Sequence, residues 1–145
     1  MILAAILPKA IAWAEARSTE ILASGVPLSD IGRRLAHLAG VNRPDRVRVS
    51  EVASIPFPDD PELREATLAA GLLGPGTIGL TLGYGIYIRA GHSSNRLVSH
   101  ECRHVHQYEE AGSIAAFLPV YLEQILSVGY TAAPLEVDAR AHERE

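Results

Sequence analysis

The stretch LVSHECRHVHQYE, residues 97–109, is the most informative part of this chain, because it contains the pattern H-E-x-x-H from His100 to His104. On an α-helix, residues four positions apart lie one above the other on the same face. His100 and His104 would then present two imidazoles to one Zn²⁺ ion at about 2.0–2.1 Å. Glu101 lies slightly further round the helix, where its carboxylate can reach a water on that metal. The pattern therefore predicts a helix that holds a hydrolytic metal site.

Such a short pattern also arises by chance, with a probability of about one in fifty in a chain with this many His and Glu residues. The alternative interpretation is a surface helix with polar residues on one side. Three features of the surroundings favour the metal site. The pattern lies inside an amphipathic stretch, a strand-like run precedes it, and an acidic ligand candidate follows it.

The length and composition indicate a single folded domain over residues 1–145, with an ordinary apolar fraction for a globular protein. The formal net charge is −4 and no basic cluster stands out, so nothing favours nucleic acid as a partner. The one cysteine, Cys102, cannot form an intrachain disulfide. It lies two positions from His100 and points away from the metal face, so we expect a buried thiol and no ligand.

No run in the sequence approaches the ~18 apolar residues that are needed to cross a bilayer, so we expect no transmembrane segment. Met1 to Leu7 is apolar, but Pro8 and Lys9 interrupt the run at once and no positive region precedes it. We therefore expect no signal peptide and a cytoplasmic location.

The hydrophobic pattern predicts an α+β fold that is mostly helical, with a small antiparallel sheet before the H-E-x-x-H helix. Residues 1–76 would supply N-terminal helices and a first strand, and residues 77–145 the second strand region and both ligand helices. The expected helices are 8–24, 29–39, 61–70, 95–110, 113–127 with a bend or restart at Pro119, and 134–145. The expected strands are 46–49 and 78–89, the latter interrupted at 83–85.

A catalytic zinc site has three protein ligands and one open position, so a third ligand must come from elsewhere in the chain. His106 lies only two residues beyond His104 and points away from the metal face, and His92 lies in the loop before the helix. Glu136, near the start of the last predicted helix, would complete a His₂Glu set. Asp138 is the alternative, and residues two apart on a helix diverge by about 200°, so only one of the two acids is expected to face the metal.

These residues resemble those of small gluzincin-type zinc peptidase domains, especially uncharacterised bacterial families with H-E-x-x-H on one helix and an acidic ligand on a later one. The resemblance covers roughly the half of the chain from Ile78 onward. It rests on His100, Glu101, His104, Gln107, Tyr108, Pro134, Glu136 and Ala139. It implies a zincin-like fold with Glu136 as the third ligand. It also implies a strand beside the cleft that receives an extended peptide, for which Gly85, Ile86, Tyr87, Ile88 and Arg89 are the candidates by position.

Relatives of this type often carry an Asp four residues after the third ligand, where this chain has Arg140. Asp138 and Glu109 are the candidates for orienting the zinc-bound histidines instead. The implied mechanism uses Glu101 as the general base on a zinc-bound water. A further donor must stabilise the oxyanion, and the candidates are Tyr130, Tyr108, Arg140 and His92.

The sequence thus predicts a metallopeptidase with one Zn²⁺ per chain that acts on a peptide or protein substrate. A second hypothesis is a non-catalytic zinc protein in which the metal holds the helices together and a surface binds a partner. A third has no metal and leaves a helical interaction domain. The presence of Glu101 favours the first, because a purely structural site needs no base beside the metal. The pattern leaves the oligomeric state open.

Overall fold

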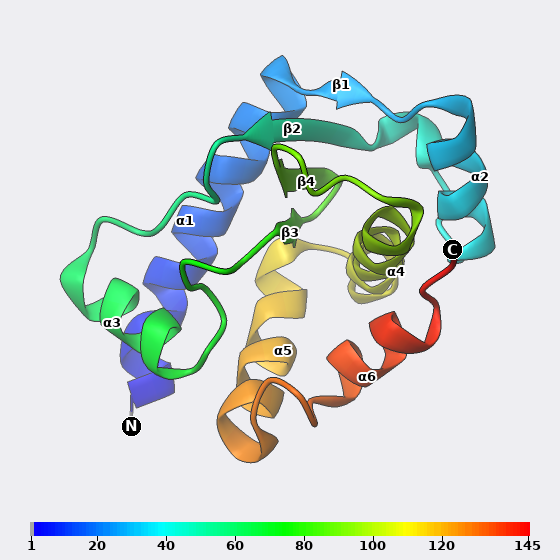
Figure 1. Ribbon diagram of the computed structural model, residues 1–145. Helices are drawn as coiled ribbons and strands as arrows, with labels where there is room; N and C mark the ends of the chain where they lie inside the picture. Colours follow the sequence, from blue (N-terminus) through cyan, green and yellow to red (C-terminus); the bar gives the residue numbers. More distant parts are fainter. Residues whose placement is uncertain (1) are drawn as a thin grey trace.

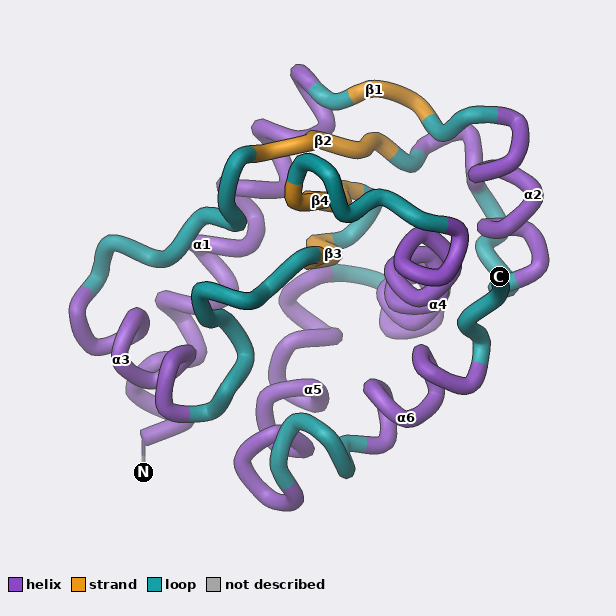
Figure 2. Tube along the Cα trace, viewed as in Figure 1, coloured by secondary structure: helices purple, strands orange, loops and turns teal. Residues whose placement is uncertain are grey.

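The structure, a computed structural model, describes residues 2–145, and over these residues the chain is mostly helical (Figures 1 and 2). The helices are α1 (Ile2–Ser24), α2 (Asp30–Leu38), α3 (Pro61–Ala69), α4 (Asn95–Ala111), α5 (Ile114–Val128) and α6 (Pro134–Ala141). The strands are β1 (Val26–Pro27), β2 (Arg48–Val52), β3 (Gly79–Leu82) and β4 (Gly85–Arg89), and a 3-10 turn, η1 (Pro44–Arg46), precedes β2. The predicted α+β class is therefore confirmed.

The four strands form one sheet in the order β1-β2-β4-β3. β3 and β4 pair antiparallel across the turn at 83–84, and β1 pairs antiparallel with β2. β2 and β4, however, run parallel, with Arg48 opposite Gly85 and Val52 opposite Arg89. The predicted antiparallel sheet is therefore wrong in this respect. The chain passes through α3 and β3 between these two strands, and a crossover of this length allows parallel pairing.

The sheet separates two apolar clusters, because successive side chains of a strand point to opposite faces. On one face Leu82 and Tyr87 pack with residues of α1, α3 and α5. On the other face Ile86 and Ile88 pack with Cys102 of α4, and α2 covers the outer side of that helix. Cys102 is fully buried, as predicted. Helix α4 is thus held between the sheet and α2 (Figure 1).

Local signals fix the ends of α4. The side chain of Ser94 accepts a hydrogen bond from the Leu97 amide, which satisfies one of the free N–H groups of the first turn. At the other end Gly112 takes a left-handed conformation with φ 97°, which glycine adopts without steric cost. The buried residues of α4 include the whole H-E-x-x-H segment except Arg103. The sequence therefore specifies both the length of this helix and its inward face.

The start of α1 and the end of α6 differ from the prediction by several residues, and α5 has no restart at Pro119. α1 begins at Ile2 and contains Pro8, although the prediction began the helix at Pro8. Packing outweighs the lost hydrogen bond there, because Ile6 and Ala10 are buried on either side of the proline. α5 likewise continues through Pro119. α6 ends at Ala141, and the segment after it turns back toward α4.

The strand predicted at 46–49 lies at Arg48–Val52, since the 3-10 turn η1 uses the residues from Pro44 onward. No single helix within residues 2–145 is both long and apolar enough to span a bilayer. α4 and α5 reach that threshold only when they are taken together, and they meet at an angle of 116°.

Candidate metal centre

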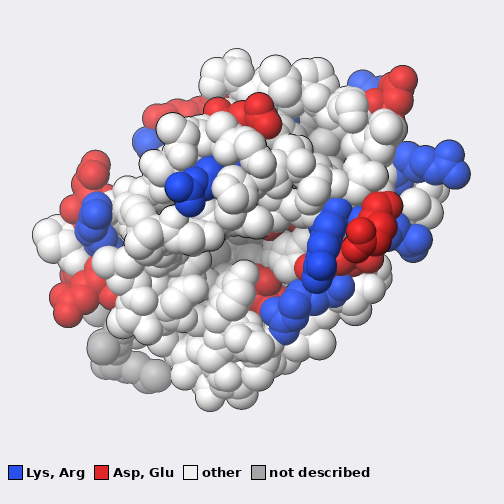
Figure 3. Space-filling model, viewed as in Figure 1, with Lys and Arg blue, Asp and Glu red and all other residues white. Residues whose placement is uncertain are grey.

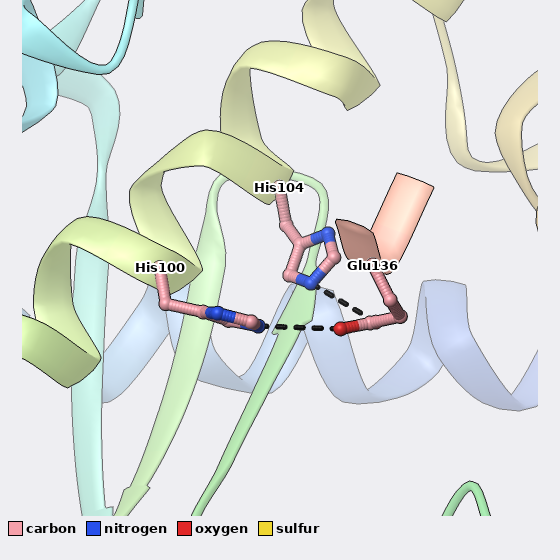
Figure 4. A group of neighbouring side chains, drawn as sticks. All are labelled: His100, His104 and Glu136. Carbon is pink, nitrogen blue, oxygen red and sulfur yellow. Dashed lines mark ion pairs between the residues drawn. The ribbon is translucent and has the colours of Figure 1, made fainter. Parts of the chain in front are cut away.

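Three side chains from two helices converge at the inner face of α4 (Figure 4). His100 Nε2 lies 3.3 Å from Glu136 Oε1, and His104 Nε2 lies 3.1 Å from Glu136 Oε2. One donor atom from each residue lies within 4.8 Å of the others, and all three side chains are buried. The helix spacing places the two imidazoles one turn apart, and the first turn of α6 brings the carboxylate opposite them.

The ring of His104 is held in one tautomer by Gln107. His104 Nδ1 lies 2.8 Å from Gln107 Oε1. The amide nitrogen of Gln107 donates to Leu135 O and to Asp138 Oδ2, both at 2.9 Å, so its oxygen is the atom that faces the histidine. An amide oxygen only accepts, hence Nδ1 of His104 carries the proton. The Nε2 lone pair of the neutral ring therefore points at Glu136.

His100 is held in the same tautomer by a carboxylate. Its Nδ1 donates to Glu143 Oε2 at 2.8 Å. Glu143 belongs to the segment after α6, which is tied to α4 by Arg96 Nε donating to Glu143 Oε1 at 2.7 Å and by the Arg144 amide donating to Ser99 Oγ at 2.9 Å. Histidines that bind metals characteristically donate their other ring N–H in this way. Both imidazoles therefore aim Nε2 at the same point.

The arrangement has the donor set of a divalent cation site. Two Nε2 lone pairs and a carboxylate face one another, which is repulsive unless a proton or a cation lies between them. Oε1 of Glu136 is buried without a hydrogen-bond partner. Two donors that bind a tetrahedral cation at about 2.0–2.1 Å lie about 3.3 Å apart. His100 Nε2 lies at a similar distance from Glu136 Oε1, 3.3 Å, and His104 Nε2 from Glu136 Oε2, 3.1 Å. The residues present therefore fit a zinc ion.

Protons can fill the same role when no metal is bound. Burial alone would lower the pKa of His100, but contact with Glu136 and the charge of Glu101 outweigh it and raise the pKa to about 9. For Glu136, burial acts to raise the pKa, and contact with the two histidines overrides this and holds the pKa far below its ordinary value. The carboxylate therefore stays ionised, ready for a metal ion or for protonated histidines.

Glu101 lies beside this group without joining it. Its Oε1 accepts a hydrogen bond from the Thr81 hydroxyl at 2.7 Å, and its side chain lines the cavity in front of the histidines. Gly79 provides the space, because a Cβ at that position would lie 2.9 Å from Glu101 Oε2 and 3.0 Å from Leu97 Cδ1. Strand β3 thus positions the carboxylate through one hydroxyl and one missing side chain.

Two tyrosines lie close to Glu136. Tyr121 of α5 donates its hydroxyl to Glu136 Oε2 at 2.6 Å. Tyr130, in the loop between α5 and α6, lines the cavity. Tyr130 is 38% exposed, and the partial burial of its phenol together with the charges of Glu136 and Glu101 raises its pKa, so the phenol remains a donor at neutral pH. Tyr130 therefore lines the cavity as a protonated phenol, and its role as an oxyanion donor stays a prediction.

The other predicted oxyanion donors either bond to a backbone carbonyl or lie outside the cavity wall. The hydroxyl of Tyr108 donates to Thr81 O at 3.1 Å, although its ring lines the cavity. Arg140 donates to the carbonyl of Thr131. His92 is exposed in the loop after β4 and is not part of the cavity wall. These three residues are therefore less suited than Tyr130 to meet a developing oxyanion.

The predicted orienting residues and the alternative ligand also take definite places. Asp138 faces away from the histidine nitrogens and accepts from Arg103 Nε at 2.8 Å as well as from Gln107. It acts on His104 only through the amide of Gln107. Glu109 accepts from the amides of Asn42 and Arg43 and from the Tyr84 hydroxyl, away from the centre.

A cavity of about 740 Å³ opens in front of the three side chains, and Figure 3 shows the hollow near the middle of this face. All of β3, Gly79–Leu82, lines it. The predicted peptide-binding strand Gly85–Arg89 is β4, which has β2 on one side and β3 on the other. Its backbone therefore has no free edge, and this expectation is wrong. β3 is the strand at the edge of the sheet, next to the cavity.

Two side chains that contact the candidate metal centre were missed from the sequence. Tyr121 lies in an apolar helix and carries no motif, and only the packing of α5 beside α6 brings it to Glu136. Glu143 lies in a charged segment that looks like solvated helix. The helix ends at Ala141 in a turn, with the Glu143 amide donating to Arg140 O, and this lets the Glu143 side chain reach His100.

Comparison with protein-family models, with curated proteins and with solved structures finds no match to this chain.

Proposed function

We propose that this chain is a zinc-dependent hydrolase of peptide bonds, with His100, His104 and Glu136 as the metal ligands and Glu101 as the general base. One observation carries the proposal: both imidazoles are fixed in the tautomer that aims Nε2 at a buried, ionised carboxylate. Nitrogen and carboxylate donors in this number are the set that catalytic zinc uses in His₂Glu sites.

When bound there, zinc would polarise the carbonyl under attack and lower the pKa of water toward about 7. Glu101 supplies the base, since its carboxylate lines the same cavity and is fixed by Thr81. It accepts the proton of the attacking water and then delivers it to the leaving amine, which conserves the proton over the reaction. Tyr130 supplies a hydroxyl that can donate to the oxyanion as it forms.

The edge strand supports a peptide as the substrate. β3 borders the cavity along its whole length, and β4 is its one strand partner, although the Thr81 carbonyl of β3 already accepts from the Tyr108 hydroxyl. An extended peptide can add to such an edge by main-chain hydrogen bonds. This would place one of its carbonyls near Glu101 and the histidines.

Replacing Glu101 by Gln tests this function. Zinc content should stay near one per chain, because Glu101 is not part of the ligand group. Hydrolysis of a mixed peptide library, followed by mass spectrometry, should fall by about 10²–10⁴-fold because the proton acceptor is lost. Glu110→Gln, an exposed change on the same helix, is the matched control and should retain activity.

Two results would contradict the proposal. Activity that survives in Glu101→Gln would remove the assigned base. A wild-type protein that carries one zinc per chain and cleaves no peptide of the library would favour the alternative, a non-catalytic zinc protein.

A further inference from the structure

The cavity in front of the metal centre extends well beyond it. From the histidines it continues past β3 to an inner wall made by α1, α3 and the loop 71–78. We call this part the apolar arm, and its lining residues that the argument uses are Ala10, Trp13, Ala14, Leu63, Leu68 and Leu72. α1 and α3 lie on the opposite side of the fold from α4 and α6 (Figure 1).

Charge is distributed unevenly along this cavity. Its acidic, basic and histidine side chains all come from α4, α6 and the segment after α6. Within residues 2–145, α1, α3 and the loop 71–78 give the lining no charged side chain, and the polar side-chain groups they bring are the hydroxyls of Thr67 and Thr77 and the indole N–H of Trp13. A charged group of a ligand placed in the apolar arm would lose its hydration without gaining a partner.

The volume of the whole cavity indicates how large a ligand it can enclose. A volume of about 740 Å³ lies within the range of roughly 300–1,000 Å³ typical of pockets that enclose a whole small ligand. Cavities lined by apolar side chains favour apolar ligands over water. The walls that α1, α3 and the loop 71–78 give to the apolar arm precede Ile78, outside the part of the chain that resembles gluzincins, whereas Phe117, Leu118 and Leu122 of α5 line the same cavity from within that part.

We propose that the apolar arm binds a long apolar chain next to the bond that the metal centre attacks, so that the substrate carries either an N-linked acyl chain or a large apolar side chain at that position. This inference rests on the proposed function for the position of the bond, but the binding of the chain itself does not depend on the metal. Amide hydrolysis then adds water across the C–N bond and releases a carboxylate and an amine.

Straight-chain hydroxamic acids with 2, 6 and 10 carbons provide the probes. Trp13 is the only tryptophan of the chain and lines the arm, so its fluorescence reports occupancy directly. The affinity should rise about three- to fourfold for each added methylene until the arm is filled. Trp13 fluorescence should change with the 10-carbon acid and stay constant with acetohydroxamic acid.

Measurement with and without zinc separates this inference from the proposed function. Removing zinc should weaken all three acids by the same factor and leave the dependence on chain length unchanged. Zinc-dependent binding without any dependence on chain length would overturn the apolar arm alone. A dependence on chain length without any effect of zinc would support the arm and count against the metal centre.

A pair of leucine variants tests the location. Leu68 and Leu126 are each 46% exposed, but only Leu68 lines this cavity. Leu68→Lys should weaken the 10-carbon hydroxamic acid at least tenfold and leave acetohydroxamic acid unaffected. Leu126→Lys should change neither. Equal effects of the two variants, or none from Leu68→Lys, would overturn the proposal.

Hydrolysis assays distinguish an N-linked acyl chain from a large apolar side chain as the group that fills the apolar arm. N-decanoylalanine and the tripeptide Ala-Phe-Ala each carry an apolar chain, whereas N-acetylalanine and trialanine do not. Faster cleavage of either member of the first pair supports the apolar arm and identifies its natural class of substrate. Equal cleavage of all four compounds would contradict it.

Discussion

The two histidines of the candidate metal centre are supported by very different surroundings, although both present Nε2 to Glu136. His104 donates to Gln107, a neutral side chain that is 6% exposed and that lies one turn further along the same helix. His100 donates to Glu143, a carboxylate whose side chain is 18% exposed and that comes from the segment after α6. The residue that supports His104 is buried and belongs to α4. The residue that supports His100 is anionic and belongs to the C-terminal segment after α6, which we call the tail.

The difference shows how a fold can fix a tautomer in two ways. A buried amide with three hydrogen-bond partners sets the ring by geometry and adds no charge. A carboxylate sets the ring and also raises the basicity of the imidazole, but water can replace it where it is partly exposed. The hydrogen bond that supports His104 should therefore contribute more to zinc binding than the one that supports His100. Four tests of this contrast follow, beginning with Glu136, which both histidines face.

Removing the carboxylate that both histidines face should have the largest effect. Glu136→Ala takes away a ligand, so the zinc affinity should fall by more than the 10–100-fold that the loss of an outer partner causes. Competition with a chelating indicator measures this. Glu123→Ala, an exposed change on α5, is the control and should bind zinc as the wild type does. An unchanged affinity in Glu136→Ala would leave Asp138 as the remaining acid on α6.

The buried support comes next. Gln107→Leu removes the acceptor of His104 and takes one donor each from Leu135 O and Asp138, and Asp138 keeps its bond to Arg103. The zinc affinity should fall by about 100-fold, at the upper end of the range for such partners. If Gln107→Leu lowers the zinc affinity less than Glu143→Gln does, the buried amide is not the stronger of the two supports.

The exposed support should matter less. Glu143→Gln keeps an acceptor for His100 and removes the charge, and the zinc affinity should fall by about tenfold. Arg96→Ala serves as the control, because Arg96 only pairs with Glu143 at the surface and such pairs contribute about 0–1 kcal/mol. An equal loss of zinc affinity in Glu143→Gln and Arg96→Ala would mean that the position of the tail, and not the charge of Glu143, supports His100.

A pH effect should be the smallest, and it should appear only without metal. The pKa of His100 is raised from 6.5 to about 9 in the folded protein, so the stability gained from its proton is fully present below pH 6.5. It is lost as the pH rises through about 9. Thermal unfolding of the metal-free protein should therefore occur at lower temperature at pH 9 than at pH 6.5. The zinc-loaded protein should lack this trend, since the metal takes the place of the proton.

Much of the centre follows from local rules. Helix geometry alone places His100 and His104 on one face, and Ser94 and Gly112 mark the ends of their helix. The divergence of neighbouring positions on α6 separates Glu136 from Asp138, and Glu136 is the one that meets the histidines. The shared face and the two helix ends depend on fewer than twenty consecutive residues, and the sequence predicts them. The contact of Glu136 with the histidines joins α4 to α6 and depends on how these two helices pack.

The rest depends on contacts between distant segments. Tyr121 reaches Glu136 only because α5 packs on α6, and no periodicity encodes that packing. The parallel pairing of β2 with β4 is a choice among strand orders that the alternation of side chains does not specify. Pro8 marks a helix start by local rules, but burial of Ile6 in the core overrides them.

The parallel pairing of β2 with β4 has a practical consequence for dissection of the molecule. Every residue of the metal centre lies after position 77, so a fragment of residues 77–145 would seem sufficient to study it. Excision would strip β2 from β4 and uncover a row of unsatisfied amides and carbonyls on a strand whose Ile86 and Ile88 are fully or almost fully buried. Exposed edges of this kind recruit further copies and aggregate. Minimised versions of this protein should therefore keep the N-terminal half and shorten loops instead.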